Sequence, residues 1–541
     1  MSFENHEKGH KGVDPHLYAN ENVDEEVGVT KRGDGLKKDL KSRHMQMIAI
    51  GGAIGAGLFI GSGGALANGG PASLVICYLI VGIMLLFTMH ALAEMAVLYP
   101  VNGAFYTYIV RFVDPSWGFA VGLDYAISWL TVLPFELTAA SLTIRFWRDD
   151  INVAVWITVF LVVLFIIQIF GVRGYGEVEF VLSLIKICAC IGFIIFGIVY
   201  NCGGVGSQGY IGGKYWYSPG AFNNGFNGFA GVFSVAAFAF AGTELSGLAA
   251  AESANPRKAI PQATKQVFWR ILFFYVINLL VLGLVLPYDD ERLAEASSAN
   301  SRFSPFVLAI EDAGVKVLPS IFNAVITISV ISVANSCTYG STRTLQAMAE
   351  RGMMPQVLAY VDKQGRPIWC VAIQLAFGFL AYIGVAGNQG KIFSWLLSLS
   401  GLSYFFVWAS ICLAHIRFRQ GWKAQGFNLQ QLPYKAPLGV IGSALGLLLN
   451  ILAIIATFYT SLYPSPNATP DAEIFFQNFL AAPVILFFYI VWKLYSRDWR
   501  MFIRVHEMDL KSGARMLNID DEPMPVKTWK NLPMRMVRAL F

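Results

Sequence analysis

The apolar stretch Met47-Ile-Ala-Ile-Gly-Gly-Ala-Ile-Gly-Ala-Gly-Leu-Phe-Ile-Gly-Ser-Gly63 is unusually rich in glycine. No Asp, Glu, Lys or Arg lies between Arg43 and Glu94, so this stretch is apolar enough to enter a lipid bilayer. Nine of the twenty residues from Gly51 to Gly70 are glycine, which permits backbone angles that other residues resist. Such a segment either packs tightly against neighbouring helices through its Gly-x-x-x-Gly spacings or breaks inside the membrane and offers its backbone to a ligand.

The composition of the whole chain indicates an all-α membrane protein. Of 541 residues, 55% are hydrophobic and 14% charged, whereas soluble domains carry about 25% charged residues. Long uncharged runs alternate with short charged loops, which is typical of many membrane-spanning helices. We expect a disordered cytoplasmic tail at 1–44, a twelve-helix domain at 45–495 and a second cytoplasmic tail at 496–541. The expected spans are approximately 47–67, 72–98, 118–143, 152–171, 177–200, 226–251, 268–287, 318–341, 368–386, 392–413, 437–460 and 474–495.

The distribution of positive charge gives the expected orientation. With the N-terminus inside and twelve spans, the tails and loops on the cytoplasmic side contain 32 Lys and Arg residues, and the outer loops contain seven. Cytoplasmic loops of membrane proteins carry an excess of these residues. We therefore expect both termini to be cytoplasmic.

A second glycine-interrupted segment, Gly228–Ala251, forms the sixth expected span. It lies five spans after the first, and two interrupted segments in corresponding positions of two halves indicate an inverted repeat with the binding site at the breaks. An odd offset of five inverts the second repeat relative to the first. The predicted fold is therefore a five-plus-five inverted repeat with broken spans 1 and 6, and two further C-terminal helices outside the repeat.

The two breaks together suit an amino acid as ligand. Free amide groups at the start of a half-helix attract a carboxylate, and free carbonyl groups accept hydrogen bonds from an ammonium group. We expect Phe240 to close over the ligand. The alternative is that the glycines serve helix packing only. The predicted contacts are Ala53, Ile54, Gly55, Ala56 and Gly57 for the carboxylate, and Phe238, Ala239, Phe240, Ala241, Gly242 and Thr243 for the ammonium end.

Three charged residues inside spans are candidates for proton coupling, because each costs about 2.5–3.5 kcal/mol to insert and so needs a reason. Glu244 falls at the sixth-span break; its alternative role is to accept hydrogen bonds from the unwound backbone. Lys186 lies in the fifth span, where it either takes the place of a cation or extends to the interface. Glu136 follows Pro134 in the third span and either takes part in coupling or closes a polar contact between helices.

Two further groups of polar residues lie on the eighth and tenth spans. Asn335, Tyr339 and Arg343 are spaced by four and share one helix face, which suits an inner gate or vestibule, unless the helix simply continues out of the membrane. The tenth-span serines are expected either to line the cavity and set substrate selectivity or to serve helix packing. They are Ser398, Ser400 and Ser403.

Catalytic chemistry has no visible signature in the sequence. The seven cysteines form no Cys-x-x-Cys pair, the histidines show no metal spacing, and no Gly-Lys-Ser/Thr follows the glycine-rich stretches. We therefore expect no enzymatic activity, no metal, no cofactor and no nucleic-acid partner.

Several motifs resemble those of the fungal amino acid permeases of the amino acid–polyamine–organocation superfamily. The similarity runs from about Lys38 to the Met508–Gly513 region. The motifs are Gly51–Gly63, Pro134-Phe-Glu-Leu-Thr-Ala-Ala-Ser141, Phe240-Ala-Gly-Thr-Glu244, Tyr339-Gly-Ser-Thr-Arg343 and Leu413-Ala-His-Ile-Arg-Phe-Arg419.

The resemblance implies a leucine transporter-like fold and proton-coupled uptake of L-amino acids across the fungal plasma membrane. It implies that Lys186 occupies the place of a sodium ion, and that the tenth span is closer to broad-specificity members. It also implies regulation by ubiquitin ligase machinery acting on tail lysines, with Lys8, Lys11, Lys31, Lys37, Lys38 and Lys41 as candidates. An amino acid receptor on the same scaffold and an amino acid exchanger remain as alternatives.

Overall fold

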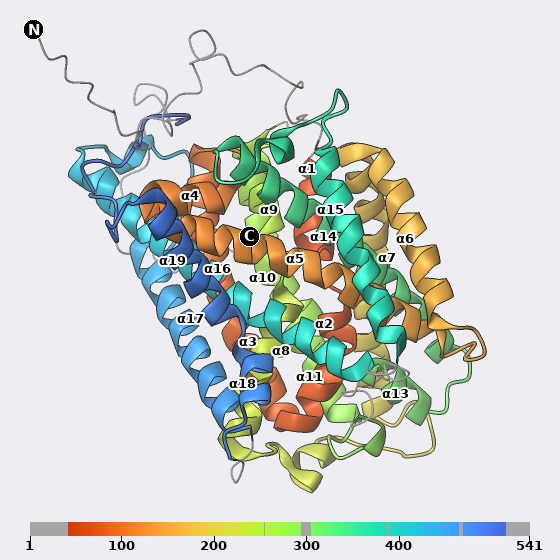
Figure 1. The fold of residues 1–541 in the computed structure, drawn as a ribbon. Helices are drawn as coiled ribbons and strands as arrows, with labels where there is room; N and C mark the ends of the chain where they lie inside the picture. Colours follow the sequence, from red (N-terminus) through yellow and green to blue (C-terminus); the bar gives the residue numbers. More distant parts are fainter. Residues whose placement is uncertain are drawn as a thin grey trace, which may run out of the picture.

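The computed structural model describes residue 40 and residues 42–253, 255–293, 304–386, 389–464 and 469–515. These residues form a bundle of helices (Figure 1), and the described part contains no β-strand, only an isolated bridge between Leu40 and Ser253. The all-α prediction is confirmed for this part of the chain. Apart from residue 40 and residues 42–44, the expected N-terminal tail lies outside the described residues.

The helices follow the expected spans closely. Within the described part of the chain, eight helical stretches are long and apolar enough to cross a membrane, and the bent pair α18 (Ala472–Phe479) and α19 (Ala481–Ser496) makes up to nine. Val153–Ile169 and Ile368–Ile383 are shorter apolar helices. Every one of the twelve expected segments falls on helical structure. The main helices are α1 (Ser42–Gly51), α2 (Ala56–Phe59), α3 (Gly61–Leu98), α4 (Ala104–Phe112), α5 (Pro115–Ile144), α6 (Val153–Ile169), α7 (Gly171–Asn201), α8 (Gly225–Phe240), α9 (Leu245–Leu248), α10 (Pro256–Arg270), α11 (Asn278–Val285), α13 (Pro305–Asp312), α14 (Leu318–Glu350), α15 (Ile368–Gly378), α16 (Gln389–Ala424), α17 (Gly439–Leu462), α18 (Ala472–Phe479) and α19 (Ala481–Ser496).

The first span is broken, as predicted. Its helix α1 ends at Gly51, the chain leaves helical geometry, and α2 begins at Ala56 after Gly55, whose backbone is extended (φ −151°, ψ −146°). The span then continues into α3 as far as Gly69. At Gly70 the backbone has φ +78°, which favours glycine, and Pro71 starts the second span. Two expected spans therefore share the helical stretch α3.

The sixth span is broken at the expected place as well. Helix α8 ends at Phe240, and Ala241 leaves helical geometry (φ −54°, ψ 146°). Gly242 follows with φ +91°, a conformation that residues with a side chain rarely adopt. A short helix, α9, resumes at Leu245. Glycine thus allows the break in both spans.

The interior of the bundle is formed by the broken spans and their immediate neighbours. Helix α5 packs along α14, and α3 packs along α8. In contrast, α7, α17 and α19 carry many exposed Leu, Ile, Val and Phe side chains, as helices facing hydrocarbon do. Figure 1 shows α6 and α17 along opposite edges of the bundle.

Both described chain ends lie at one end of the bundle, here called the tail end. The amide of Leu40 donates to the carbonyl of Glu252. The segment 497–515 packs back onto the same region, since the amide of Arg515 donates to the carbonyl of Leu98 and Arg257 donates to the carbonyl of Arg515. Helix α13 lies at the opposite end, called the α13 end (Figure 1).

Candidate functional site

A small cavity lies between the two breaks. Its volume is about 10 Å³, which holds about one water molecule. Three of the predicted first-break residues line it, together with Phe238 and Ala241 of the sixth span. The lining residues are Ala53, Gly55, Gly57, Trp129, Val132, Glu136, Phe238, Ala241, Val333 and Tyr404.

The two breaks are in direct contact, and glycine makes this possible. A Cβ atom added to Gly242 would lie 2.8 Å from the carbonyl oxygen of Gly52. A Cβ atom on Gly57 would lie 2.7 Å from Cα of Ala239, and one on Gly55 would collide with a methyl group of Val333. Real Cβ atoms do not approach other atoms so closely, so a larger residue at any of these positions must displace its neighbour.

The first break presents amide groups to the cavity, and Glu136 lies beside them. Because α2 begins at Ala56, the amides of its first turn have no partner within the helix. The Glu136 carboxylate, on α5, interacts with the backbone amide of Ala56 and with the charge of Lys186. It is buried, and its Oε2 atom has no hydrogen-bond partner among the described residues. Ile54 is buried and does not line the cavity.

The carbonyl groups of the sixth break already accept hydrogen bonds. The carbonyl of Phe238 accepts from the amide of Ala241 (3.2 Å), that of Ala239 from the Tyr275 hydroxyl (2.8 Å), and that of Phe240 from the Thr243 hydroxyl (2.7 Å). Each carbonyl keeps a second lone pair. Their contact with a ligand ammonium group therefore stays a prediction.

The side chain of Phe240 does not line the cavity. It is fully buried, with its ring centroid 4.2 Å from that of Tyr275 and 5.8 Å from that of Tyr78. Phe238, two residues earlier, lines the cavity instead and packs edge-on against Phe135. Phe238 therefore lies at the cavity in this structure, and the gating role expected of Phe240 stays a prediction.

Glu244 holds the sixth break together. Its Oε1 atom accepts from the Tyr125 hydroxyl (3.0 Å) and from the backbone amide of Gly242 (3.2 Å), and Oε2 accepts from the Trp408 indole (3.4 Å). These contacts match the alternative interpretation, a carboxylate that accepts from the unwound backbone. Charge-assisted hydrogen bonds of this kind are stronger than neutral ones.

Lys186 lies inside the bundle with no exposed surface, so its side chain does not extend to the interface. Its Nζ atom is 3.8 Å from Oε1 of Glu179, two helical turns earlier on α7. Glu179 is equally buried and also accepts from Ser332 (2.7 Å) and Ser183 (3.2 Å). Lys186 therefore lies between two carboxylates, those of Glu179 and Glu136.

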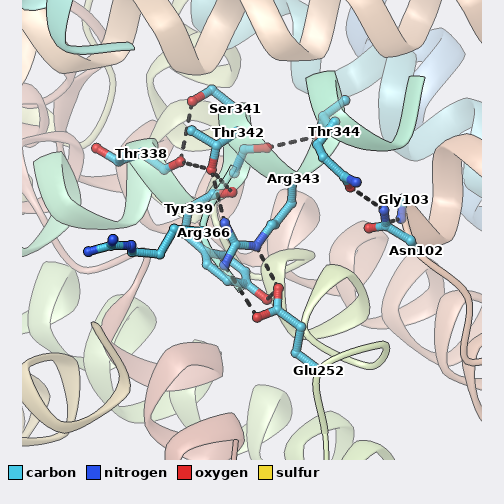
Figure 2. A network of polar contacts seen from close by, with 12 residues as sticks. Asn102, Gly103, Glu252, Thr338, Tyr339, Ser341, Thr342, Arg343, Thr344 and Arg366 are labelled. Atoms are coloured by element: carbon cyan, nitrogen blue, oxygen red, sulfur yellow. Dashed lines mark hydrogen bonds and ion pairs between the residues drawn. The ribbon is translucent and has the colours of Figure 1, made fainter. Parts of the chain in front are cut away.

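The polar face of α14 forms a buried network with Glu252 near the tail end of the bundle (Figure 2). Arg343 Nε donates to Glu252 Oε1 (2.6 Å), and the Tyr339 hydroxyl donates to the same oxygen (3.2 Å). The ring of Tyr339 stacks on Tyr175 of α7 with centroids 4.8 Å apart. All of these side chains are buried. Asn335, one turn deeper, accepts from Gln168 of α6 (3.0 Å).

Aromatic side chains close the α13 end. Phe59 of α2 packs against Phe306 of α13 and Phe322 of α14, with ring centroids 5.3 and 5.9 Å away. Phe193 of α7 contacts Phe306 at 4.6 Å and Phe322 at 5.8 Å. We call these four residues the aromatic cluster. The Ser304 hydroxyl, next to α13, donates to the carbonyl of Phe59 (2.5 Å).

The tenth-span serines are not among the residues that line the cavity. Ser400 is buried, with its hydroxyl 3.4 Å from that of Thr131 on α5, and Ser403 is buried next to Asp124. The side chain of Ser398 lies outside the described residues. Tyr404 of the same helix lines the cavity, and its hydroxyl has no hydrogen-bond partner among the described residues. A role of the serines in selectivity stays a prediction.

Several buried charges were not singled out from the sequence, among them Glu179, Arg270 and Glu252. Glu179 could have been identified from the sequence, because a spacing of seven residues places it on the same helix face as Lys186. Arg270 lies at the start of the seventh expected span. It is buried and donates to the Thr243 hydroxyl at the sixth break, and its charge interacts with Glu244.

Two broken spans that meet at a buried cavity, closed at both ends of a membrane bundle, define a multi-pass transporter. The profile of the family described as "Amino acid permease" matches residues 44–505. The chain therefore belongs to the amino acid permease family, and it is a membrane transport protein, not an enzyme.

Curated relatives and solved structures agree with this assignment. The chain is 51% identical to "Cationic amino acid transporter 1" of Schizosaccharomyces pombe, over 94% of this chain and 87% of that protein. It is 48% identical to "General amino-acid permease GAP1" of Saccharomyces cerevisiae, over 94% and 85%. A solved manganese transporter of Eremococcus coleocola superposes with a TM-score of 0.52 at 13% identity, covering 84% of this chain and 94% of that one. This last similarity supports the leucine transporter-like fold alone.

Proposed function

We propose that the protein takes up amino acids together with protons across the plasma membrane, by alternating access. The observation that carries the proposal is the position of Glu136, whose carboxylate lies in the cavity beside the amide of Ala56 and interacts with Lys186. A titratable group at the binding site can link occupancy by substrate to occupancy by a proton.

The link between substrate and proton follows from charge. The amides at the start of α2 suit the carboxylate of an amino acid, but Glu136 lies beside the same amides. Two carboxylates in one buried site repel each other, which favours the protonated form of one of them. Substrate binding therefore favours uptake of a proton by Glu136. Lys186, whose Nζ atom lies 3.8 Å from Oε1 of Glu179, is the basic group that interacts with Glu136.

Alternating access requires each end of the bundle to open in turn. The cavity is far smaller than an amino acid, so substrate entry requires the two breaks to separate or a gate to move. We assign the inner gate to Arg343, Glu252 and Tyr339 at the tail end, and the outer gate to the aromatic cluster at the α13 end. We expect Glu252→Gln to raise the rate at which a thiol reagent applied from the tail side labels a cysteine introduced into the cavity wall. Glu350→Gln, farther along α14, serves as control.

The substrate range is proposed to be broad. The cavity walls are apolar and aromatic apart from Glu136, and one relative carries the printed name of a general permease. The name of another relative specifies cationic amino acids, for which the Glu136 charge would be a partner. A competition panel of amino acids against one labelled substrate tests this; competition by basic amino acids alone would restrict the range.

The decisive experiment measures uptake of a labelled amino acid into vesicles that contain the purified protein. We expect accumulation driven by an inward proton gradient, no response to a sodium gradient, and loss of proton-driven accumulation in Glu136→Gln. Uptake that follows sodium and ignores pH would refute proton coupling. Counterflow without net accumulation would identify an exchanger, and saturable binding without transport would identify a receptor.

The proposed orientation places the tail end in the cytoplasm. Leu40 and Arg515 lie at the same end of the bundle, and the excess of Lys and Arg falls on that side. The tail lysines proposed as sites for ubiquitin ligase machinery lie outside the described residues. Tags at both termini should resist protease added to intact cells; digestion of either tag would overturn this orientation.

A further inference from the structure

An apolar groove runs between α7 and α14 on the outside of the bundle, in the half nearest the α13 end. Its volume is about 470 Å³, within the usual range of small-molecule sites. Every residue that lines it is Leu, Ile, Val, Phe, Ala, Gly or Cys. Prominent among them are Leu184, Cys188, Gly192 and Phe196 on α7, and Ile321 and Val325 on α14.

The groove faces the hydrocarbon of the membrane. Leu184 and Ile321 are each more than half exposed, and Cys188 is exposed as well. No side chain of the described residues offers a charge or hydrogen bond inside it. Water finds no hydrogen-bond partners in such a space, so we expect the groove to be occupied by hydrocarbon. The absence of polar groups within the groove favours a flexible hydrocarbon chain over a ligand with a polar group along its length.

The dimensions of the groove match one leaflet. From Leu184 to Phe196 the helix advances about 18 Å, at about 1.5 Å per residue, and half of a hydrocarbon core is about 15 Å thick. At the α13 end, the exposed side chain of Lys316 precedes Leu318, which lines the groove. A cation at that level of a helix end is suitably placed for the phosphate of a lipid headgroup.

The inner wall of the groove belongs to the aromatic cluster. Phe193 and Phe322 line the groove and also contact Phe306, and Phe322 contacts Phe59 of the broken first span. An occupant of the groove therefore lies directly behind the residues that close the α13 end. It adds dispersion contacts to a wall that is otherwise incompletely packed.

We propose that this groove binds one acyl chain of a phospholipid from the leaflet on the α13 side, with the phosphate near Lys316. The bound chain fills the space between α7 and α14 and supports the aromatic cluster. The lipid is thus a structural ligand of the transporter at a defined site. This inference does not depend on proton coupling or on the choice of substrate.

Gly192 provides a variant that fills the groove without disturbing the fold. A Cβ atom at Gly192 would meet no atom within 4 Å, so a leucine there fits into the groove. Val181→Leu is the matched control, because Val181 is also exposed on α7 but does not line the groove.

The test uses the full-length protein in vesicles doped with a phosphatidylcholine that carries a photoactivatable group on its acyl chain. We expect cross-links on peptides around Cys188–Phe196 and Leu318–Val325. Their yield should fall by about tenfold in Gly192→Leu, because the new side chain excludes several methylene groups of the lipid. The yield should not change in Val181→Leu. Lys316→Gln should lower the yield less than Gly192→Leu does.

Three outcomes would overturn the proposal. One is uniform cross-linking over all lipid-facing helices, including α17; another is an unchanged yield in Gly192→Leu. The third is preferential labelling by a photoactivatable sterol that phosphatidylcholine fails to displace. Thermal unfolding gives an independent readout: adding phosphatidylcholine to detergent-purified protein should raise Tm more for the wild type and Val181→Leu than for Gly192→Leu. Equal increases would contradict a lipid in the groove.

Discussion

The two broken spans resemble each other in sequence but are held in place by different forces. In the first, Gly55 and Gly57 pack so closely against Val333 and Ala239 that a methyl group has no room. In the sixth, buried side chains hold the backbone through hydrogen bonds: Glu244 accepts from the amide of Gly242, and Tyr275 donates to the carbonyl of Ala239. The first break thus depends on shape, and the sixth depends on a polar network.

This difference suits the two breaks to different roles, ligand binding for the first and a rigid frame for the sixth. At a break held by shape the backbone amides can exchange partners, so a ligand carboxylate can replace the Glu136 carboxylate at the amide of Ala56. A break whose carbonyls already have partners is a rigid frame against which the first can move. We therefore expect added volume to impair the first break, and loss of a hydrogen-bond partner to weaken the sixth.

The strongest test of the first half of this comparison is Gly57→Val. The added side chain would collide with the backbone of Ala239, and displacing a binding group by about 1 Å can reduce rates about 100-fold. We expect loss of uptake at normal surface abundance, measured with a labelled amino acid and surface biotinylation. Gly213→Val, where an added Cβ atom meets only Tyr217 at an ordinary contact distance of 3.5 Å, should transport normally. Normal transport by Gly57→Val would place the ligand elsewhere.

A weaker loss, about tenfold, is expected for Gly55→Ala, because the colliding atom is a methyl group of Val333 and side chains move more readily than backbone. The second change Val333→Ala removes that methyl group. The double variant should therefore recover much of the uptake that Gly55→Ala loses, as measured by initial rates. A double variant no better than Gly55→Ala alone would show that volume at this contact is not what matters.

In the sixth break, Glu244→Gln should cost about 1–3 kcal/mol of stability, because the amide nitrogen of glutamine cannot accept the hydrogen bonds that one carboxylate oxygen accepts. Thermal unfolding in detergent measures this loss. Tyr125→Phe, which removes a single donor to Glu244, is the matched control and should lose less. If Glu244→Gln kept its stability but lost proton-driven uptake, Glu244 would be a coupling group and the polar frame would not depend on its charge.

The sequence predicted the backbone features of both breaks better than the side-chain partners. Apolar, glycine-rich segments are local signals, so the interruption between Gly51 and Ala56 and its counterpart near Gly242 could be located to within a few residues from the chain alone. The direction of a side chain depends on how its helix is rotated in the bundle. For this reason Phe238, not Phe240, reaches the cavity.

Contacts between segments distant in the sequence could not be predicted from the sequence either. Arg270 meets Thr243 only because α10 returns beside the sixth break, and Glu252 meets Arg343 only because α14 passes the end of α9. Glu179 could have been paired with Lys186 from its spacing on one helix. The segment 497–515 packs against the tail end because its backbone carbonyls accept from distant side chains such as Gln425 and Arg257, and because Met508 and Leu510 are buried.

The smallest expected effect comes from Tyr275→Phe, which removes one hydroxyl donor from the carbonyl of Ala239 and leaves the ring packed against Phe240. A neutral hydrogen bond contributes about 0.5–1.5 kcal/mol, so a drop in Tm and a modest fall in uptake should result. Tyr200→Phe is the control, since the buried Tyr200 hydroxyl has no hydrogen-bond partner among the described residues. Removing it should leave stability unchanged. If the two variants behaved alike, the Tyr275 hydroxyl would not support the sixth break, and Glu244 would be left as the main side-chain support of its backbone.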